Sequence, residues 1–416
     1  MERILDLHIH SRFSRACSPK LTLENIGRVS QEKGVHIVAT GDFTFPAWFE
    51  EIKTELVEEN NSGLFRLKNH PEITTRFILS TELSLVYKDE VRVRRIHIMV
   101  QAPSISAVEE LNKQLDKRFN IRSDGRPILK LPAPELVKIC LAIHPRFLIY
   151  PAHIWTPWYA IFGSKSGFNS LKECFGDQTK HIYAYETGLS SDPEMNWRLS
   201  ALDKLTLLSN SDAHSLPNIG REANVMDLDG YSYDEIYEVI KNKDLNKLKY
   251  SIEFYPEEGT YYLDGHRDCN FSCDVAETKK LKGICPKCKK PLVVGVSYRV
   301  AELADREIGF KFKGAQGFKK LVELDKIIAE VLGIKSRQSM KVQAYYRKMI
   351  GKLGPELEIL IKTELNDIEQ AFDKRIAEGI RRVREGQLIV EAGYDGVYGK
   401  IKIFSEAEQG NQSKLI

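Results

Sequence analysis

The sequence predicts an α/β protein: a barrel of strands and helices, then a small metal-binding module and a mainly α-helical C-terminal region. From residue 1 to about 250, short β-branched runs alternate with amphipathic segments, the pattern of parallel strands joined by helices. Beyond that point, four of the seven cysteines fall within twenty residues, and helical periodicity follows. We expect the three units to cover residues 1–250, 251–312 and 313–416.

Length and composition agree with this organisation. A β/α barrel takes about 250 residues, so a chain of 416 has room for two smaller units. No stretch approaches the ~18 consecutive apolar residues of a membrane span, and the N-terminus lacks the features of a signal peptide. We therefore expect a cytoplasmic protein with no membrane partner. The net charge of +3 is too small to identify an anionic partner by itself.

Seven parallel strands are expected in the first unit, because seven runs are rich in Val, Ile, Leu and aromatic residues. They cover residues 4–10, 35–42, 76–85, 95–102, 147–154, 182–189 and 205–214. Helices are expected between them, some with Ser, Thr or Asp near the start as a cap. They cover residues 22–33, 46–58, 105–117, 134–143, 194–204 and 232–243.

Residues able to bind a metal ion stand at or near the ends of these strands. The first strand ends in His8-Ile9-His10, and alternate strand residues face the same side, so both histidines can reach one ion. The other seven candidates are Asp42, Glu82, His97, His153, Glu186, Asp212 and His214. Taken singly, each has an ordinary alternative as a solvated acid or a hydrogen-bonded core histidine.

Together, these nine side chains predict a multinuclear metal centre. The carboxyl ends of parallel barrel strands meet at one mouth. Burying so many polar groups there would cost several kcal/mol each unless cations neutralise them. Imidazole and carboxylate ligands suit two or three divalent ions, with Zn²⁺, Mg²⁺ and Mn²⁺ all open.

The second unit has the ligand spacing of a structural zinc ribbon. His266-x2-Cys269 is followed, after fifteen residues, by Cys285-x2-Cys288. This two-knuckle spacing predicts one structural Zn²⁺ without catalytic duty. Cys273 is an alternative to His266, because Cys269-x3-Cys273 is also possible; the tighter spacing favours His266.

The third unit contains a candidate DNA-binding helix. Residues 335–352 hold six basic residues and no acidic ones, with two tyrosines interleaved. Three of these side chains share one helical face, as expected of a surface that contacts phosphates and stacks on bases. The candidate contacts are Lys335, Arg337, Lys341, Tyr345 and Lys348. An ordinary solvated basic helix is the alternative.

Further candidates for DNA contact lie near the expected mouth. Arg12, Arg15 and Arg221 could contact phosphate, with surface ion pairs as the alternative. Trp155 and Trp158 follow His153 closely and could line a pocket for an extruded base, with core packing as the alternative.

The strand-end residues together resemble the PHP (polymerase and histidinol phosphatase) family of metal-dependent phosphoesterases over residues 1–250. That family has a distorted seven-stranded β/α barrel with two or three metals in its mouth. One departure stands on the second strand: many members have Thr-Asp-His, whereas this chain has Thr40-Gly41-Asp42. A carboxylate thus replaces an imidazole, which leaves the identity of the metal open.

Four longer segments resemble the endonuclease Q family more narrowly, at residues 40–44, 186–193, 209–214 and 264–269. In that family a PHP barrel is followed by a zinc module and a helical C-terminal region. The resemblance implies a DNA-repair endonuclease that cuts DNA containing deaminated bases. The cut lies on the 5′ side of hypoxanthine, uracil or xanthine, or of an abasic site.

Phosphodiester hydrolysis needs an activated water and charge stabilisation, which clustered divalent ions provide. We expect Glu82 to bridge two metals and Asp212 to complete their shells. Asp192 is the candidate for orienting water or holding a third ion, although Asp before Pro is also a common loop residue. Two other functions stay open: a PHP phosphatase acting on a small phosphorylated metabolite, and a non-catalytic DNA-binding scaffold.

The C-terminal tail offers one further hypothesis. Residues 412–416 have the first half of a Gln-x-x-aliphatic sliding-clamp motif but lack its aromatic pair. Without that pair we do not expect this tail to contact a clamp as it stands, so a sliding clamp as a partner is only a hypothesis.

Overall fold

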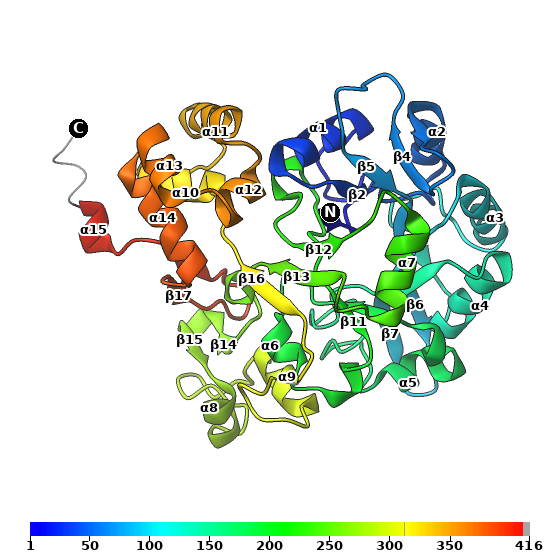
Figure 1. The fold of residues 1–416 in the computed structure, drawn as a ribbon. Helices are drawn as coiled ribbons and strands as arrows, with labels where there is room; N and C mark the ends of the chain where they lie inside the picture. The colour runs from blue at the N-terminus through cyan, green and yellow to red at the C-terminus, as the bar shows by residue number, and fades with distance from the viewer. Residues whose placement is uncertain (312, 411–416) are drawn as a thin grey trace.

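The computed structural model describes residues 1–311 and 313–410. An α/β body is followed by a small Cys/His-containing module and by a helical region that includes a hairpin (Figure 1). The α/β fold class is the one expected. None of the described helices combines the length and the apolar character that crossing a membrane requires.

The main sheet of the body has eight strands in the order β16-β13-β12-β1-β2-β5-β4-β3. They are β1 (Glu2–Asp6), β2 (Ile37–Ala39), β3 (Leu56–Glu58), β4 (Leu64–Leu67), β5 (Arg76–Ile78), β12 (Ala223–Asp227), β13 (Leu248–Glu253) and β16 (Gly317–Lys320). Strands β1, β2 and β5 run parallel, with Leu5 opposite Ile37 and Val38 opposite Phe77. These paired residues are buried, as expected of strands covered on both faces.

A second sheet of four strands and a separate parallel pair complete the body. The sheet has the order β8-β6-β7-β9, and its strands are β6 (Ser80–Lys88), β7 (Val93–Gln101), β8 (Ile128–Leu129) and β9 (Leu148–Pro151). The pair is β10 (Ala184–Glu186) with β11 (Thr206–Leu208). All seven expected strand positions therefore carry strands.

The prediction that these strands all run parallel is wrong. Strand β7 is antiparallel to both β6 and β9. The chain reverses at residues 89–92, where the amide of Asp89 donates to the carbonyl of Arg92, and a connection this short cannot make a crossover. The run expected at 76–85 is also two strands, separated at Leu79.

Helices lie between the strands largely where the sequence predicts them. The body contains α1 (Leu23–Lys33), α2 (Pro46–Glu55), α3 (Ile105–Asp116), α4 (Ala133–Ile143), α5 (Leu171–Phe175), α6 (Pro193–Asn196) and α7 (Tyr233–Asn242). Thr22, Ser104 and Ser232 cap α1, α3 and α7 through their side-chain oxygens. The helix expected at 194–204 is instead the short α6 and a 3₁₀ turn, Ser200–Leu202.

The Cys/His-containing module is an insertion between two paired strands. It contains a hairpin of β14 (Asp264–His266) and β15 (Phe271–Cys273), followed by α8 (Val275–Lys280) and α9 (Val296–Leu303). Strand β13 precedes the module and β16 follows it, and the two pair in parallel with Tyr250 opposite Gly317. Residues 317–320, expected in the helical region, are therefore an edge strand of the main sheet.

The helical region lies beside α1 and the main sheet (Figure 1). Its elements are α10 (Leu324–Val331), α11 (Met340–Leu353), α12 (Glu356–Ile361), α13 (Leu365–Ala371), α14 (Lys374–Glu385), the hairpin β17 (Ile389–Glu391) with β18 (Lys400–Lys402), and α15 (Glu406–Gly410). The tail of the sliding-clamp hypothesis, residues 412–416, lies outside the described residues.

A buried ion pair joins the helical region to the body. Lys33 Nζ at the end of α1 lies 2.8 Å from Glu356 Oε2 at the start of α12. The Tyr346 hydroxyl donates to the same oxygen at 2.8 Å, and the amide of Leu324 donates to Oε1 at 3.0 Å. Both charged side chains are buried, so either one left alone would be an uncompensated charge.

Replacing Glu356 by Gln should therefore lower the free energy of unfolding by about 3 kcal/mol, because it leaves the Lys33 ammonium buried without a counter-ion. Chemical denaturation measures the loss. Glu358→Gln, at an exposed position of the same helix, is the matched control and should change stability little. Equal stability of both variants would contradict a structural role for the pair.

Candidate metal centre

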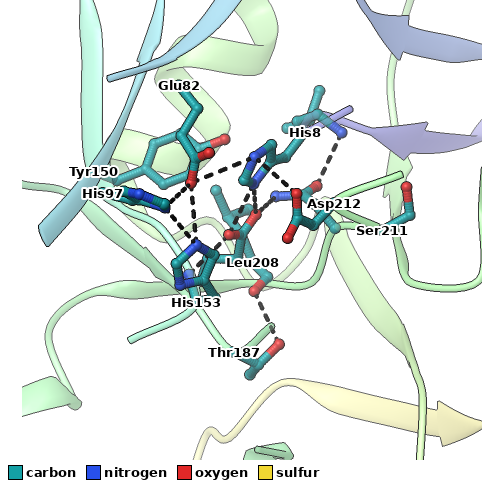
Figure 2. Close-up of polar contacts among 12 residues, drawn as sticks. His8, Glu82, His97, Tyr150, His153, Thr187, Leu208, Ser211 and Asp212 are labelled. Atoms are coloured by element: carbon teal, nitrogen blue, oxygen red, sulfur yellow. Dashed lines mark hydrogen bonds and ion pairs between the residues drawn. The ribbon is translucent and has the colours of Figure 1, made fainter. Parts of the chain in front are cut away.

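Six acidic and imidazole side chains from five segments of the chain meet at one end of the body. Figure 2 shows five of them, namely His8, Glu82, His97, His153 and Asp212. His8 and His10 follow β1, Glu82 lies on β6, His97 on β7, His153 after β9 and Asp212 after β11. They form two groups whose candidate ligand atoms lie within 4.8 Å of one another. The groups are His8, His10, Glu82 and Asp212, and Glu82, His97 and His153.

Glu82 belongs to both groups and presents one oxygen mainly to each. Its Oε1 lies 2.9 Å from His97 Nδ1 and 3.0 Å from His153 Nε2. Its Oε2 lies 3.3 Å from His10 Nε2. A carboxylate placed in this way has the geometry to bridge two cations.

The break at Leu79 explains how Glu82 reaches this position. Glu82 is the third residue of β6, and His97 lies in the middle of β7. Both residues were expected at or near the ends of their strands, but neither one ends its own strand. Glu82 instead follows closely on the end of β5, which is parallel to β1 and β2.

Two further acids contact the Nδ1 atoms of the His8 and His10 rings. His8 Nδ1 lies 3.0 Å from Glu186 Oε2, and His10 Nδ1 lies 3.0 Å from Asp42 Oδ1. Because a carboxylate accepts, each Nδ1–H donates, so Nε2 is the ring atom that could offer a lone pair to a cation. Glu186 and Asp42, expected as direct ligands, thus lie outside both groups and fix the rings of two residues within them.

The first group contains buried atoms that form no hydrogen bond. They are His8 Nε2, His10 Nε2 and Asp212 Oδ1. Asp212 Oδ1 lies 3.6 Å from His8 Nε2 and 3.1 Å from His10 Nε2, so the three face one another. Buried polar atoms normally have partners, and a divalent cation would satisfy all three at once. The residues present therefore fit a metal ion.

The charge of the centre also favours a cation. Burial lowers the pKa of His8, but Glu186, Glu82 and Asp212 together raise it well above its usual value. Burial raises the pKa of Glu82, but His97, Arg126 and His8 hold it well below its usual range. Burial lowers the pKa of His97 to about 4. Glu82 is thus ionised at neutral pH, and His97 has a free lone pair.

Three residues of the centre and its surroundings have left-handed backbone conformations. Asp42, His153 and Asp212 adopt positive φ angles of 49°, 27° and 46°. A histidine there is unusual, and such conformations persist where the surroundings dictate them. Gly188 packs against His153 so closely that a Cβ atom would lie 2.4 Å from the His153 Cβ.

Two other predicted site residues lie outside both groups. His214 packs on His10, with 4.6 Å between ring centroids, and its Nδ1 lies 2.9 Å from the Asp212 carbonyl oxygen. Asp192 caps α6 by accepting from the amide of Met195, and its Oδ2 lies 2.7 Å from Lys320 Nζ. Those contacts give Asp192 a structural role, and its expected role of orienting water or holding a third ion stays a prediction.

Arg126 also contacts the centre and was not among the residues predicted from the sequence. This residue lies just before β8, and its Nη1 lies 2.9 Å from Glu82 Oε2. The neighbouring Gly125 approaches the centre so closely that a Cβ atom would lie 2.6 Å from Asp42 Oδ2. The sequence feature that could have identified Arg126 is the Asp-Gly-Arg turn at 124–126, in a segment where neither a strand nor a helix is expected.

The candidate DNA contacts in the body divide into core and exposed residues. Trp155 is 1% exposed, and its Nε1–H donates to Asn196 Oδ1 at 2.8 Å, so it belongs to the core and not to a base pocket. Trp158 is 47% exposed and borders a hollow of about 220 Å³ that Tyr261 and Tyr262 also line.

The three arginines expected near the mouth differ in whether another residue already binds their side chain. Arg12 Nη2 lies 2.7 Å from Glu51 Oε1, and Arg221 donates to the carbonyl of Ser211. Arg15 is exposed. Arg15 is thus the most open of the three toward solvent.

The basic run at 335–352 keeps most of its expected exposure, although Lys335 and Arg337 precede α11 and do not lie on it. Lys335, Lys341 and Lys348 are exposed, and Tyr345 is half-buried beside Phe372. Arg337 differs from the expectation of DNA contact. Its guanidinium lies 2.9 Å from Glu323 and 3.3 Å from Asp325, and it donates to Asn218 at 2.6 Å. Glu323 and Asp325 thus bind the guanidinium that was expected to contact DNA.

A second candidate metal site lies in the inserted module. His266, Cys269, Cys285 and Cys288 bring their ligand atoms within 4.8 Å of one another. Cys273, the alternative fourth ligand, contacts Thr278 Oγ1 at 3.2 Å and lies outside this quartet. The module therefore holds a Cys₃His cluster of the kind that binds a metal ion.

Comparison with known sequences finds relatives without a described activity. The family described as MJ0043 C-terminal domain matches residues 323–387. Uncharacterized protein YqxK of Bacillus subtilis is 29% identical over 95% of this chain and 98% of its own length. Uncharacterized protein MJ0043 of Methanocaldococcus jannaschii is 32% identical over 59% of this chain, a match that spans 31% of that protein.

Comparison with solved structures is more informative. The lesion-specific endonuclease PfuEndoQ from Pyrococcus furiosus is 30% identical, with a TM-score of 0.85 over 99% of both chains. Endonuclease Q in complex with a 27-mer duplex that has an abasic lesion at the active site is 31% identical, with a TM-score of 0.84 over 98% of both chains. Likeness of this extent, in sequence and in structure, shows that the chain belongs to the endonuclease Q family.

Proposed function

We propose that this protein is a metal-dependent DNA-repair endonuclease. It hydrolyses the phosphodiester on the 5′ side of a deaminated base such as hypoxanthine, uracil or xanthine, or of an abasic site. The observation that carries the proposal is the pair of buried ligand groups sharing Glu82, in a chain that belongs to the endonuclease Q family. A relative bound to a duplex with an abasic lesion supports the substrate class.

Two divalent ions fit the two groups. His8, His10, Glu82 and Asp212 would hold one, and Glu82, His97 and His153 the other. Such ions supply charge stabilisation at the phosphate and lower the pKa of a water. Asp42 and Glu186 keep two imidazole rings in the orientation that directs Nε2 inward. We assign to Asp212, whose side chain is part-exposed, the role of orienting the incoming water.

The hollow beside Trp158 is the best place for the extruded base. It adjoins the centre through Thr156, which lines the hollow and whose Oγ1 lies 3.1 Å from His153 Nδ1. An aromatic wall suits a base removed from the stack, because every base has a π-face. Outside the mouth, Arg15 and the exposed Lys335, Lys341 and Lys348 are the residues we assign to the DNA backbone.

Purified protein should nick duplexes containing inosine, uracil or an abasic site, and chelation should abolish the activity. His8→Ala should lose at least about 100-fold in rate together with bound metal, because it removes a ligand and not merely a ring's support. His70→Ala, at a histidine paired with Glu72 outside both groups, is the control. Nicking that survives complete removal of metal would contradict the proposal.

The same assay separates this function from its rivals. Turnover of a small phosphate monoester well above that of lesion DNA would indicate a phosphatase. Metal analysis tests the scaffold alternative, since a scaffold needs only the ion of the Cys₃His cluster.

We assign a structural Zn²⁺ to the Cys₃His cluster. Cys288→Ala should lose about one equivalent of zinc and increase proteolysis of residues 256–310, because so short a module depends on its ion for folding. Cys273→Ala should keep the zinc, since that thiol contacts Thr278 instead. Zinc analysis after gel filtration measures both, and loss of zinc from Cys273→Ala alone would reverse the assignment.

Trp158→Ala should raise the KM for a uracil-containing duplex by about 10-fold, the effect of losing one stacked base. The same variant should cut an abasic-site duplex like the wild type, because that lesion has no base to stack. Steady-state nicking of the two duplexes measures the difference. Equal losses on both would exclude base stacking as the role of Trp158.

A further inference from the structure

An arginine stands within the cluster of acids at the mouth, and the function proposed above does not use it. Arg126 Nη1 lies 2.9 Å from Glu82 Oε2. Among the described residues, this is the ion pair that joins a lysine or arginine to either ligand group. Asp212 and Asp42 also act on this guanidinium electrostatically. Arg126 therefore lies on the edge of the centre where three carboxylates gather.

The backbone of Arg126 is held rigidly. Its amide donates to Asp124 Oδ1 at 2.9 Å, and the amide of Gly125 donates to the carbonyl of Phe13 at 3.0 Å. The carbonyl of Gly125 accepts from Thr44 Oγ1. Gly125 also fits against Asp42 with no room for a side chain. The turn thus presents Arg126 to the centre in a fixed place.

The guanidinium has donors to spare. Of its five N–H groups, one hydrogen bond is recorded among the described residues, from Nη1 to Glu82 Oε2. The side chain is 23% exposed, and no Arg126 nitrogen is among the buried polar atoms of the described chain that lack a partner. The remaining donors therefore reach solvent at the edge of the centre and are available to a ligand.

A guanidinium fixed on one side by a carboxylate directs its other N–H groups in a known direction. Its planar fork matches two oxygens of a phosphate, and little side-chain entropy is lost when the partner arrives. A lysine would offer only a point charge there. Resting on the endonuclease function, we propose that Arg126 binds the scissile phosphate directly, with Glu82 as the anchor of its fork.

Two other roles would give the same ion pair. Arg126 could serve only to neutralise Glu82, in which case its loss would change metal content and act through that acid. It could also serve only to hold the 124–126 turn, in which case its loss would weaken every DNA ligand equally. A test must separate a contact with the phosphate from both.

The experiment pairs Arg126 variants with a change in the phosphate itself. Wild type, Arg126→Ala and Arg126→Lys are loaded with metal and assayed under single-turnover conditions on a uracil-containing duplex. A second duplex carries an uncharged methylphosphonate at the scissile position, and its competition constant reports binding without that charge. Metal content and melting temperature are measured for every variant.

We expect Arg126→Ala to raise the half-saturating concentration of the normal duplex by about 10- to 100-fold, the effect of losing a charge-assisted bidentate contact. Arg126→Lys should recover part of the loss. All three proteins should bind the methylphosphonate duplex within about twofold of one another, because the charge that Arg126 contacts is missing. Metal content should not change.

Arg122→Ala is the matched control, since Arg122 lies in the same segment, is exposed and pairs with Asp116 at 2.6 Å. It should behave as the wild type does on both duplexes. Loss of metal from Arg126→Ala, equal losses on both duplexes, or no loss at all would each overturn the inference. A wild type that nicks no lesion duplex would overturn the endonuclease function, and the inference with it.

Discussion

The structure depends on neutralising one buried carboxylate, that of Glu82. The side chain is 1% exposed, and an isolated charge at such a position would be unstable. Four imidazoles and one guanidinium surround it instead, contributed by segments from His8 to His153. Closing the body around this acid requires β1, β6, β7 and the end of β9 to meet at one place. The same condition makes that place attractive to divalent cations.

Much of this arrangement could be predicted from the sequence because residues able to bind a metal recur on or just after the expected strands. His8, His10, Glu82, His97, His153 and Asp212 do come together as expected. Spacing along a strand could not show which acids face the common point and which lie behind a histidine ring. Asp42 and Glu186 therefore lie close to the centre as expected, but they contact histidine Nδ1 atoms and are not members of either ligand group. That distinction depends on side-chain direction, which β-periodicity does not determine.

The other errors have separate physical causes. The nine residues between the expected strands at 76–85 and 95–102 are too few for a helical crossover, so an antiparallel hairpin could have been predicted from length alone. Trp155 and Trp158 lie three residues apart, and nothing in the local sequence shows that the first one packs in the core. Arg337 belongs to a basic run, but Glu323 and Asp325, which bind it, precede that run. Local composition does not report such partners.

The insertion of the Cys₃His module between β13 and β16 has a mechanical consequence. A domain on a single linker pivots about one point, but this module leaves the main sheet from one strand and returns to it on the adjacent, hydrogen-bonded strand. Two tethers side by side on a rigid support remove most of that freedom. Tyr261 and Tyr262 follow the first tether and line the hollow together with Trp158. The position of these two tyrosines beside Trp158 therefore depends on the pairing of two strands and not on a single flexible linker.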